Sequence, residues 1–302
     1  MAGPDTARAP HVDARASDAQ LARLARTGAA PWLHGEVARR MAERLQVIRC
    51  RPQTVVDWSA ALGMSAKVLA DAYPGARRIA VEAHPALRAR ALREARRPWW
   101  SPARWRDVAP DVLDPGQLAP GGAQLLWANM ALHFAADPEA LMRQWQRALA
   151  VDGFLMFSTF GPDTLRELRA VHADRGWPPP AQDFVDMHDI GDQLVHAGFA
   201  DPVMDQEHLT LTWSSAGEAL RELRALGGNL HPMRHRGLRS PRWRSALETA
   251  LAATADAQGR IALTFEIVYG HAFKAAPRAR VAAETNVPLD DLRAMVRRAR
   301  GA

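Results

Sequence analysis

The stretch VVDWSAALG, residues 55–63, is an apolar run that ends in an acid and then turns toward a helix. The first strand of an open α/β sheet ends in this way, and its turn brings the backbone close to a ligand. A glycine-rich fingerprint would place glycine at positions 59, 61 and 63 of that turn, whereas this chain has Ser59, Ala61 and Gly63. Glycine permits positive φ and leaves room for a ligand. Taken alone, the pattern therefore favours an ordinary strand-to-helix turn with Asp57 as a helix cap.

A second acid follows the next strand-like run, RRIAVEA at residues 77–83. Glu82 lies 25 residues after Asp57, about the separation between a nucleotide-binding turn and the acid that holds the ribose hydroxyls. The alternative for Glu82 is a solvated strand end. If the fold is an open sheet, these two acids indicate where a ligand would bind.

Apolar runs alternate with helical segments over the first half of the chain. The strand-like pattern returns at residues 54–58, 123–130 and 153–160. The segments with helical spacing between them are 35–48, 64–73 and 138–150. Continuous apolar runs of this kind indicate parallel strands covered on both faces, and such strands are joined by right-handed crossovers. The sequence predicts a doubly wound, Rossmann-like α/β sheet, with a weaker further strand within residues 105–113.

The second half of the chain is richer in helix before a long final strand at residues 261–274. Three helical segments precede that strand, at residues 189–197, 216–226 and 241–255. Residues 1–17 lack periodicity and predict a disordered leader, so the domain is expected to span residues 18–275. Residues 276–302 are predicted to be a flexible tail with a short helix at 288–300, which begins with proline and acids and ends in arginines.

Composition narrows the function classes. Hydrophobic residues at 48% and charged residues at 24% are typical of a soluble globular protein. The net charge of +6 comes mainly from arginines scattered along the chain. No basic stripe interleaved with aromatic residues is present, which argues against a nucleic-acid partner. The positive charge would suit an acidic protein partner. The single Cys50 excludes an internal disulfide and a multi-cysteine zinc site, so the cytoplasm is the expected compartment. The chain has no run of 18 uncharged apolar residues, so no membrane span is predicted.

Two later blocks are more specific than the turn. They are LLWANMALHFAADPEALMRQWQRALAVDGFLMFSTFGPDTLRELR at residues 125–169 and FVDMHDIGDQLVHAGFADPVMDQEHLTLTW at residues 184–213. With LRALGGN, RHRGL and EIVYGHAFK, they resemble the malonyl-[acyl-carrier-protein] O-methyltransferases of biotin synthesis. The resemblance implies a class I fold of seven strands with the last strand antiparallel, S-adenosylmethionine as cofactor, and a helical insertion at about residues 214–258 that covers the substrate.

The resemblance also assigns positions to the cofactor. Asp57 matches the acid that ends the first strand, and Glu82 matches the acid that binds the ribose diol. The glycine loop corresponds to Ser59, Ala61 and Gly63, while Asn129 to His133 lie in the loop beside the methionine moiety. Two departures stand out. Two of the three loop glycines are replaced, and Phe134 stands where the family commonly has tryptophan.

Methyl transfer from a sulfonium is a direct displacement, so the protein chiefly has to align the reacting groups. A malonyl carboxylate is already ionised at neutral pH, so no catalytic acid or base is expected. A cation that orients the carboxylate is expected, and Arg234 matches the arginine after the family's GG-x-N element; the alternative is an exposed arginine with no role. His133 and His188 lie near acids but lack metal-ligand spacing, so no metal is predicted.

Three functions remain open from the sequence. The first is methylation of a malonyl thioester carried by acyl carrier protein or coenzyme A. The second keeps the fold but assigns a binding or assembly role, as expected if the altered loop excludes the cofactor. The third is a methyltransferase for another small molecule. The cluster Trp99, Trp100 and Trp105 either packs under the sheet edge or forms a partner surface.

Overall fold

The computed structural model describes residues 12–96 and 109–276. The expected helix at 288–300 and the cluster Trp99, Trp100 and Trp105 lie outside these ranges. All strands and helices discussed below lie within them.

Seven strands form one sheet in the order β3-β2-β1-β4-β5-β7-β6. The bounds are β1 Thr54–Trp58, β2 Arg77–Val81, β3 Asp111–Leu113, β4 Ala123–Ala128, β5 Leu149–Phe160, β6 Ala200–Trp213 and β7 Ile261–Phe273. Strands β1 to β5 run parallel to one another, whereas β7 runs antiparallel to both β5 and β6. The predicted doubly wound sheet with an antiparallel last strand is confirmed. The chain reverses its direction of winding between β1 and β4, which is where open α/β sheets bind ligands.

Alternate residues of the inner strands enter two separate cores. Val55 of β1 packs with α2 (Trp32–Arg44) and α4 (Ala66–Ala72) on one face of the sheet. Val56 packs with α7 (Pro138–Ala148) and α9 (Met187–His196) on the other. Since both faces are covered, the inner strands consist mostly of apolar residues. This burial explains the continuous apolar runs that indicated a parallel sheet.

The first helix begins within residues 1–17, the range predicted to be a disordered leader. Helix α1 spans Ala14–Thr27, and the Asp13 side chain caps it by accepting from the backbone N–H groups of Arg15 and Ala16. The Asp13 N–H donates to the Leu230 carbonyl, and the Ser17 hydroxyl donates to the Phe134 carbonyl. These long-range bonds order residues 13–17, which have no apolar periodicity of their own.

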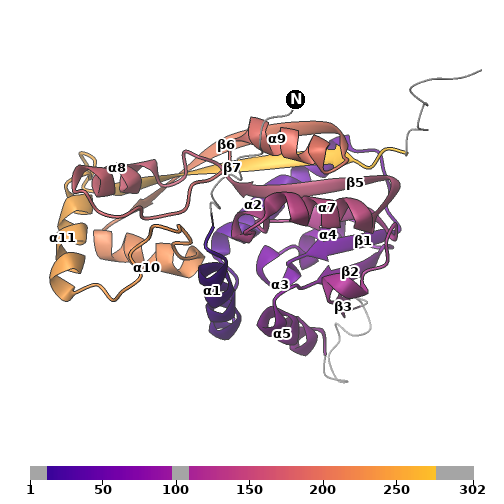
Figure 1. Cartoon of the computed structure of the whole chain (residues 1–302), viewed down its shortest axis with the longest axis horizontal. Coiled ribbons are helices and arrows are strands. Elements are labelled where there is room, and N and C mark those ends of the chain that lie inside the picture. The colour runs from indigo at the N-terminus through magenta and orange to yellow at the C-terminus, as the bar shows by residue number, and fades with distance from the viewer. Residues whose placement is uncertain (1–11, 97–108, 277–302) are drawn as a thin grey trace, which may run out of the picture.

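The insertion between β6 and β7 contains α10 (Ala216–Leu226) and α11 (Pro241–Ala252). Together with α8 (Arg166–Asp174), these helices gather at one end of the molecule, and α1 lies next to α10 (Figure 1). Ser215 caps α10 and Ser240 caps α11, as serine commonly does at a helix start. The helical insertion expected before the last strand is therefore present.

Strand β6 was not predicted by its own pattern. Its side chains alternate between partly buried and exposed over most of its length, because it is an edge strand paired only with β7.

Helix α5 (Pro85–Ala95) lies in the crossover that connects β2 to β3.

Candidate functional site

Strand β1 passes directly into a single helical turn, α3 (Ala60–Gly63). Ser59 lies between them with φ 58° and ψ 42°, a left-handed conformation that favours glycine. Its backbone N–H donates to the Val81 carbonyl of β2 at 2.8 Å, which holds the turn against the neighbouring strand. Ala61 does not have a positive φ. The strain of replacing loop glycines therefore falls on Ser59 alone, at roughly 1–2 kcal/mol.

Gly63 is needed for close packing rather than for its dihedral angle. A Cβ at this position would lie 3.0 Å from Ser65 Oγ and 3.6 Å from the Asn129 carbonyl oxygen. The Asn129 side-chain amide also donates to the Gly63 carbonyl at 2.7 Å. Gly63 thus allows the turn after β1 to contact the loop after β4.

The two acids identified in the sequence lie side by side at the ends of β1 and β2, and both are buried. The Ala61 N–H donates to Glu82 Oε1 at 2.5 Å. Burial raises the pKa of Glu82 to about 7. Burial, with the nearby charge of Glu82, raises the pKa of Asp57 well above its usual range. Asp57 Oδ1 has no hydrogen-bond partner, so the pair has unmet acceptor capacity.

Asn129 links the turn after β1 to the loop after β4. Its amide nitrogen donates to the carbonyls of His34 and Gly63, and its Oδ1 accepts from the Ser158 hydroxyl at 2.7 Å. All of these groups are buried. Because the amide is fully engaged, Asn129 acts here as a structural clamp on the loop.

His34 was missed by sequence reasoning, because it lies in α2, far along the chain from the turn. Its Nδ1 lies 2.9 Å from the Leu62 carbonyl and donates to it, which leaves Nε2 as a buried acceptor without a partner. Burial lowers the pKa of His34 to about 4, so the ring is neutral at physiological pH. Only the packing of α2 against α3 reveals this residue.

His133 stands between the turn and a large cavity. Its ring lies 6.1 Å from His34 and packs against Phe134 at 4.2 Å and Phe160 at 4.8 Å, all between ring centroids. Burial, and then proximity to His34, lowers its pKa well below the usual range, and its Nδ1 has no partner. The side chain that replaces the family's tryptophan, Phe134, thus forms part of an aromatic wall beside His133.

Three buried polar atoms at this end of the sheet lack partners: Asp57 Oδ1, His34 Nε2 and His133 Nδ1. Each such group costs roughly 1–3 kcal/mol unless a ligand or water satisfies it. Leu24 of α1 packs with Leu62 and Leu87 beside them. A ligand with hydroxyl and ammonium donors next to an apolar group fits these residues, and S-adenosylmethionine has that chemistry. Glu82 is only 1% exposed, and Leu24 of α1 packs on Leu62 in the turn to which Glu82 is bonded.

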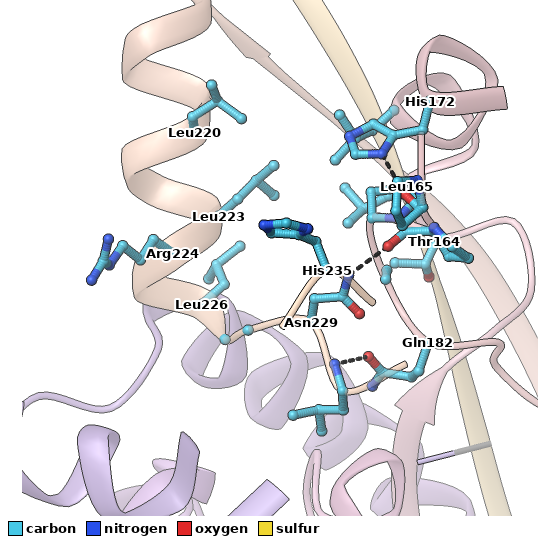
Figure 2. Close-up of a pocket in the computed structure, with 18 of the residues that line it drawn as sticks. Thr164, Leu165, His172, Gln182, Leu220, Leu223, Arg224, Leu226, Asn229 and His235 are labelled. Carbon is cyan, nitrogen blue, oxygen red and sulfur yellow. Dashed lines mark hydrogen bonds between the residues drawn. The ribbon is translucent and has the colours of Figure 1, made fainter. Parts of the chain in front are cut away.

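The cavity beside His133 has a volume of about 350 Å³. Figure 2 shows Leu220, Leu223 and Leu226 of α10 facing Leu165 and His172 across it. Asn229 and His235 lie between these two walls (Figure 2). The insertion therefore forms one wall of the cavity, and the lining is mostly apolar.

Arg234 is held away from this cavity. Its guanidinium donates to Asp13 Oδ2 at 2.7 Å and to the His231 carbonyl at 3.1 Å, and it does not line the cavity. It ties the insertion to the start of α1. The arginines that do line the cavity are Arg224 and Arg239, and Arg239 lies over the Trp243 ring at 4.1 Å. The carboxylate role expected of Arg234 does not fit this placement.

Asp163, His208 and Glu266 are ligand-type side chains whose nearest oxygen and nitrogen atoms lie within 4.8 Å of one another. Glu266 accepts from the Asp163 N–H at 2.7 Å, and the Arg166 guanidinium lies 3.3 Å from the Asp163 carboxylate. A guanidinium at this distance opposes a bound cation. The group instead fixes the turn between β5 and α8.

Known proteins are similar to this chain over most of its length. The family described as Methyltransferase domain matches residues 56–157. The malonyl-[acyl-carrier protein] O-methyltransferase of Halorhodospira halophila is 40% identical over 243 residues, covering 80% of this chain and 81% of that protein. The protein of the same name from Laribacter hongkongensis is 38% identical over 253 residues, covering 82% and 84%.

Solved structures show the same fold at low identity. The YcgJ protein from Bacillus subtilis aligns with a TM-score of 0.54 at 13% identity, covering 79% of this chain and 99% of that one. Over the described residues, no helix is both long and apolar enough to cross a membrane. The sheet order, the acids at the switch point and relatives at 38–40% identity agree, and the chain belongs to the malonyl-[acyl-carrier protein] O-methyltransferase family.

Proposed function

We propose that this protein transfers the methyl group of S-adenosylmethionine to the free carboxylate of a malonyl thioester on acyl carrier protein, as the names of its relatives suggest. One observation carries the proposal. His133 lines the apolar cavity, and its ring lies 6.1 Å from that of His34, which is hydrogen-bonded to the turn after β1. We take this turn as the first compartment, for the donor, and the cavity as the second, for the acceptor. A donor in the first compartment and an acceptor in the second would meet at this residue.

The donor supplies an electrophilic methyl group when it is bound. Glu82 would hold its ribose hydroxyls, since its carboxylate is buried beside the turn and already accepts from the Ala61 N–H there. Asp57 and the ring nitrogens of His34 and His133 would accept from its remaining donors. The backbone of residues 59–63 and the loop of Asn129 set the shape of the compartment. Closure by α1 would exclude water, which favours alignment.

The acceptor carboxylate needs a cation for orientation but no proton transfer. We assign this role to Arg239, because it lines the cavity and forms no ion pair with any described residue. The other lining arginine, Arg224, points away from the cavity (Figure 2). Arg234 was the sequence candidate, and its guanidinium already has a carboxylate partner in Asp13. A planar guanidinium can bind a carboxylate through two parallel hydrogen bonds, which would fix the attacking oxygen.

Transfer of a labelled methyl group to a malonyl thioester tests the assignment. Arg239→Ala should raise KM for the thioester about tenfold or more, with partial recovery in Arg239→Lys. Arg234→Ala should mainly lower stability. If Arg234→Ala raises KM and Arg239→Ala does not, the two arginines are assigned the wrong way round. If the parent enzyme transfers no methyl to malonyl or other small carboxylates, the proposed function is wrong.

A binding role without catalysis is the second candidate, and the side chain at Ser59 with the α1 cover favours it. Calorimetric titration with S-adenosylmethionine and its demethylated product separates the two. Heat of binding at micromolar to millimolar ligand supports the enzyme, and no heat at millimolar ligand supports the binding role.

We also propose that a malonyl thioester of coenzyme A can serve as the acceptor. The compartment that we propose for the protein is the cytoplasm.

A further inference from the structure

Residues 223–247 carry six arginines and no acidic residue. They begin at the end of α10, pass along the cavity and continue into α11. The rest of the chain has 33 arginines and lysines against 33 acids. The whole net charge of +6 therefore resides in this segment. Such a concentration creates a local positive field.

Most of these arginines are available to a partner. Arg234 is bound by Asp13, and Arg244 by Glu248. Among the described residues, Arg224 and Arg242 form no ion pair, and Arg242 is exposed. Arg236 is 73% exposed by side chain and lies 3.8 Å from Asp13, too far for a firm pair. The basic charge on this segment is therefore mostly uncompensated.

Two large apolar side chains project beside the arginines. Leu238 is fully exposed and Met233 is 73% exposed. They lie on either side of Arg236, in the segment that includes His235, Gly237 and Arg239 of the cavity lining. A large exposed apolar side chain within a charged rim is typical of a protein contact. The segment is thus both a wall of the cavity and an unpartnered surface.

We propose that Met233, Arg236, Leu238 and Arg242 form the docking face for an acidic acyl carrier protein. This inference rests on the proposed function and adds the location of the partner. Charge complementarity selects the occupant, because an acidic helix would pair with Arg236 and Arg242 while Leu238 and Met233 contact its apolar side chains. A carrier seated here lies at the wall of the cavity, so its thioester arm enters between α10 and the loop of His235 (Figure 2).

The test compares two acceptors that share the malonyl group. One is malonyl-acyl carrier protein, and the other is malonyl-N-acetylcysteamine, a small neutral thioester that lacks the carrier. The variant is Arg236→Glu with Arg242→Glu. The control is Arg143→Glu with Arg147→Glu, which makes the same charge change on α7, remote from the insertion (Figure 1). Leu238→Ser tests the apolar contact separately.

Arg236→Glu/Arg242→Glu should lower kcat/KM for the carrier substrate about tenfold or more through KM. It should leave kcat/KM for the small thioester within about twofold, as should the α7 control for both substrates. Added salt should weaken the parent's carrier affinity and affect the variant little. Equal effects on both substrates, or no effect on either, would overturn the docking face while leaving the proposed function intact.

Binding to unloaded carrier protein, measured by surface plasmon resonance, separates the two proposals if the parent proves inactive. Loss of carrier binding in the variant but not in the α7 control supports the docking face even without methyl transfer. Carrier binding that is equal in parent and variant overturns it. An inactive parent by itself counts against the proposed function only.

Discussion

Replacing Glu82 by glutamine should make the protein more stable at pH 8 and change it little at pH 5. Glu82 is buried at the end of β2, and its pKa is raised to about 7. In the unfolded chain a glutamate titrates near 4.3. The folded protein therefore holds a proton that the unfolded chain releases, and the free energy of unfolding falls as pH rises from about 4 to about 7. This stabilisation is fully present below that window and lost above it.

The size of the effect follows from the displacement of the pKa. At about 1.4 kcal/mol per unit, a shift from near 4.5 to about 7 corresponds to about 3 kcal/mol lost by pH 8. Glu82→Gln removes the charge and keeps an oxygen that accepts from the Ala61 N–H. Asp57, whose pKa is also raised, retains a slope of the same sign in both proteins. The variant should therefore gain up to about 3 kcal/mol over the parent at pH 8.

Urea unfolding at pH 5, 6.5 and 8 at constant ionic strength measures the difference. Glu43→Gln is the control, because Glu43 is 58% exposed by side chain on α2, and it should show no pH-dependent difference of this size. S-adenosylmethionine should stabilise the parent more at pH 8 than at pH 5, since ribose hydroxyls donate to the ionised carboxylate. A Glu82→Gln difference that is the same at pH 5 and pH 8 would refute the raised pKa of the buried Glu82 carboxyl.

Three further substitutions test the turn, the β5–α8 junction and the α1 cover. Ser59→Gly should stabilise the protein by up to about 1 kcal/mol in urea unfolding, because relief of the left-handed strain exceeds the cost of a more flexible unfolded chain. Ser59→Ala, which keeps a Cβ, should not stabilise it. Gly161→Ala should destabilise by about 1–3 kcal/mol, since its Cβ would lie 2.4 Å from the buried Glu266 Cδ, and Gly75→Ala, with no atom within 4 Å, is the control. Leu24→Ala should lower the free energy of unfolding by about 2–5 kcal/mol, measured with heat or urea. Leu92→Ala, at an exposed position, is the control and should lower it by less than about 1 kcal/mol. Equal losses would contradict the packing of α1.

The site was predictable wherever it depends on position within the fold. Asp57 and Glu82 end adjacent parallel strands, so their proximity followed from the strand pattern. Gly63 and Asn129 meet because the turn after β1 lies beside the loop after β4. Of the two substituted glycine positions, Ser59 and Ala61, only Ser59 has a positive φ, and the sequence did not indicate which one would.

The site was not predictable where contacts join distant segments. Arg234 follows a family motif, yet Asp13, 221 residues away in sequence, binds its guanidinium. His34 carries no local signal, and only packing of α2 on α3 buries its unpaired nitrogen. Residues 13–17 lack periodicity, and bonds to the Leu230 and Phe134 carbonyls order them.

The sequence by itself determined the doubly wound sheet, its antiparallel last strand and the family, because apolar runs record local burial and the later blocks record ancestry. Tertiary structure decided which arginine faces the cavity, which histidines remain unpaired and how far the carboxyl pKa values move. Those properties depend on distances between side chains that are far apart in the chain, and burial changes the energy of a charge in ways that residue order does not encode.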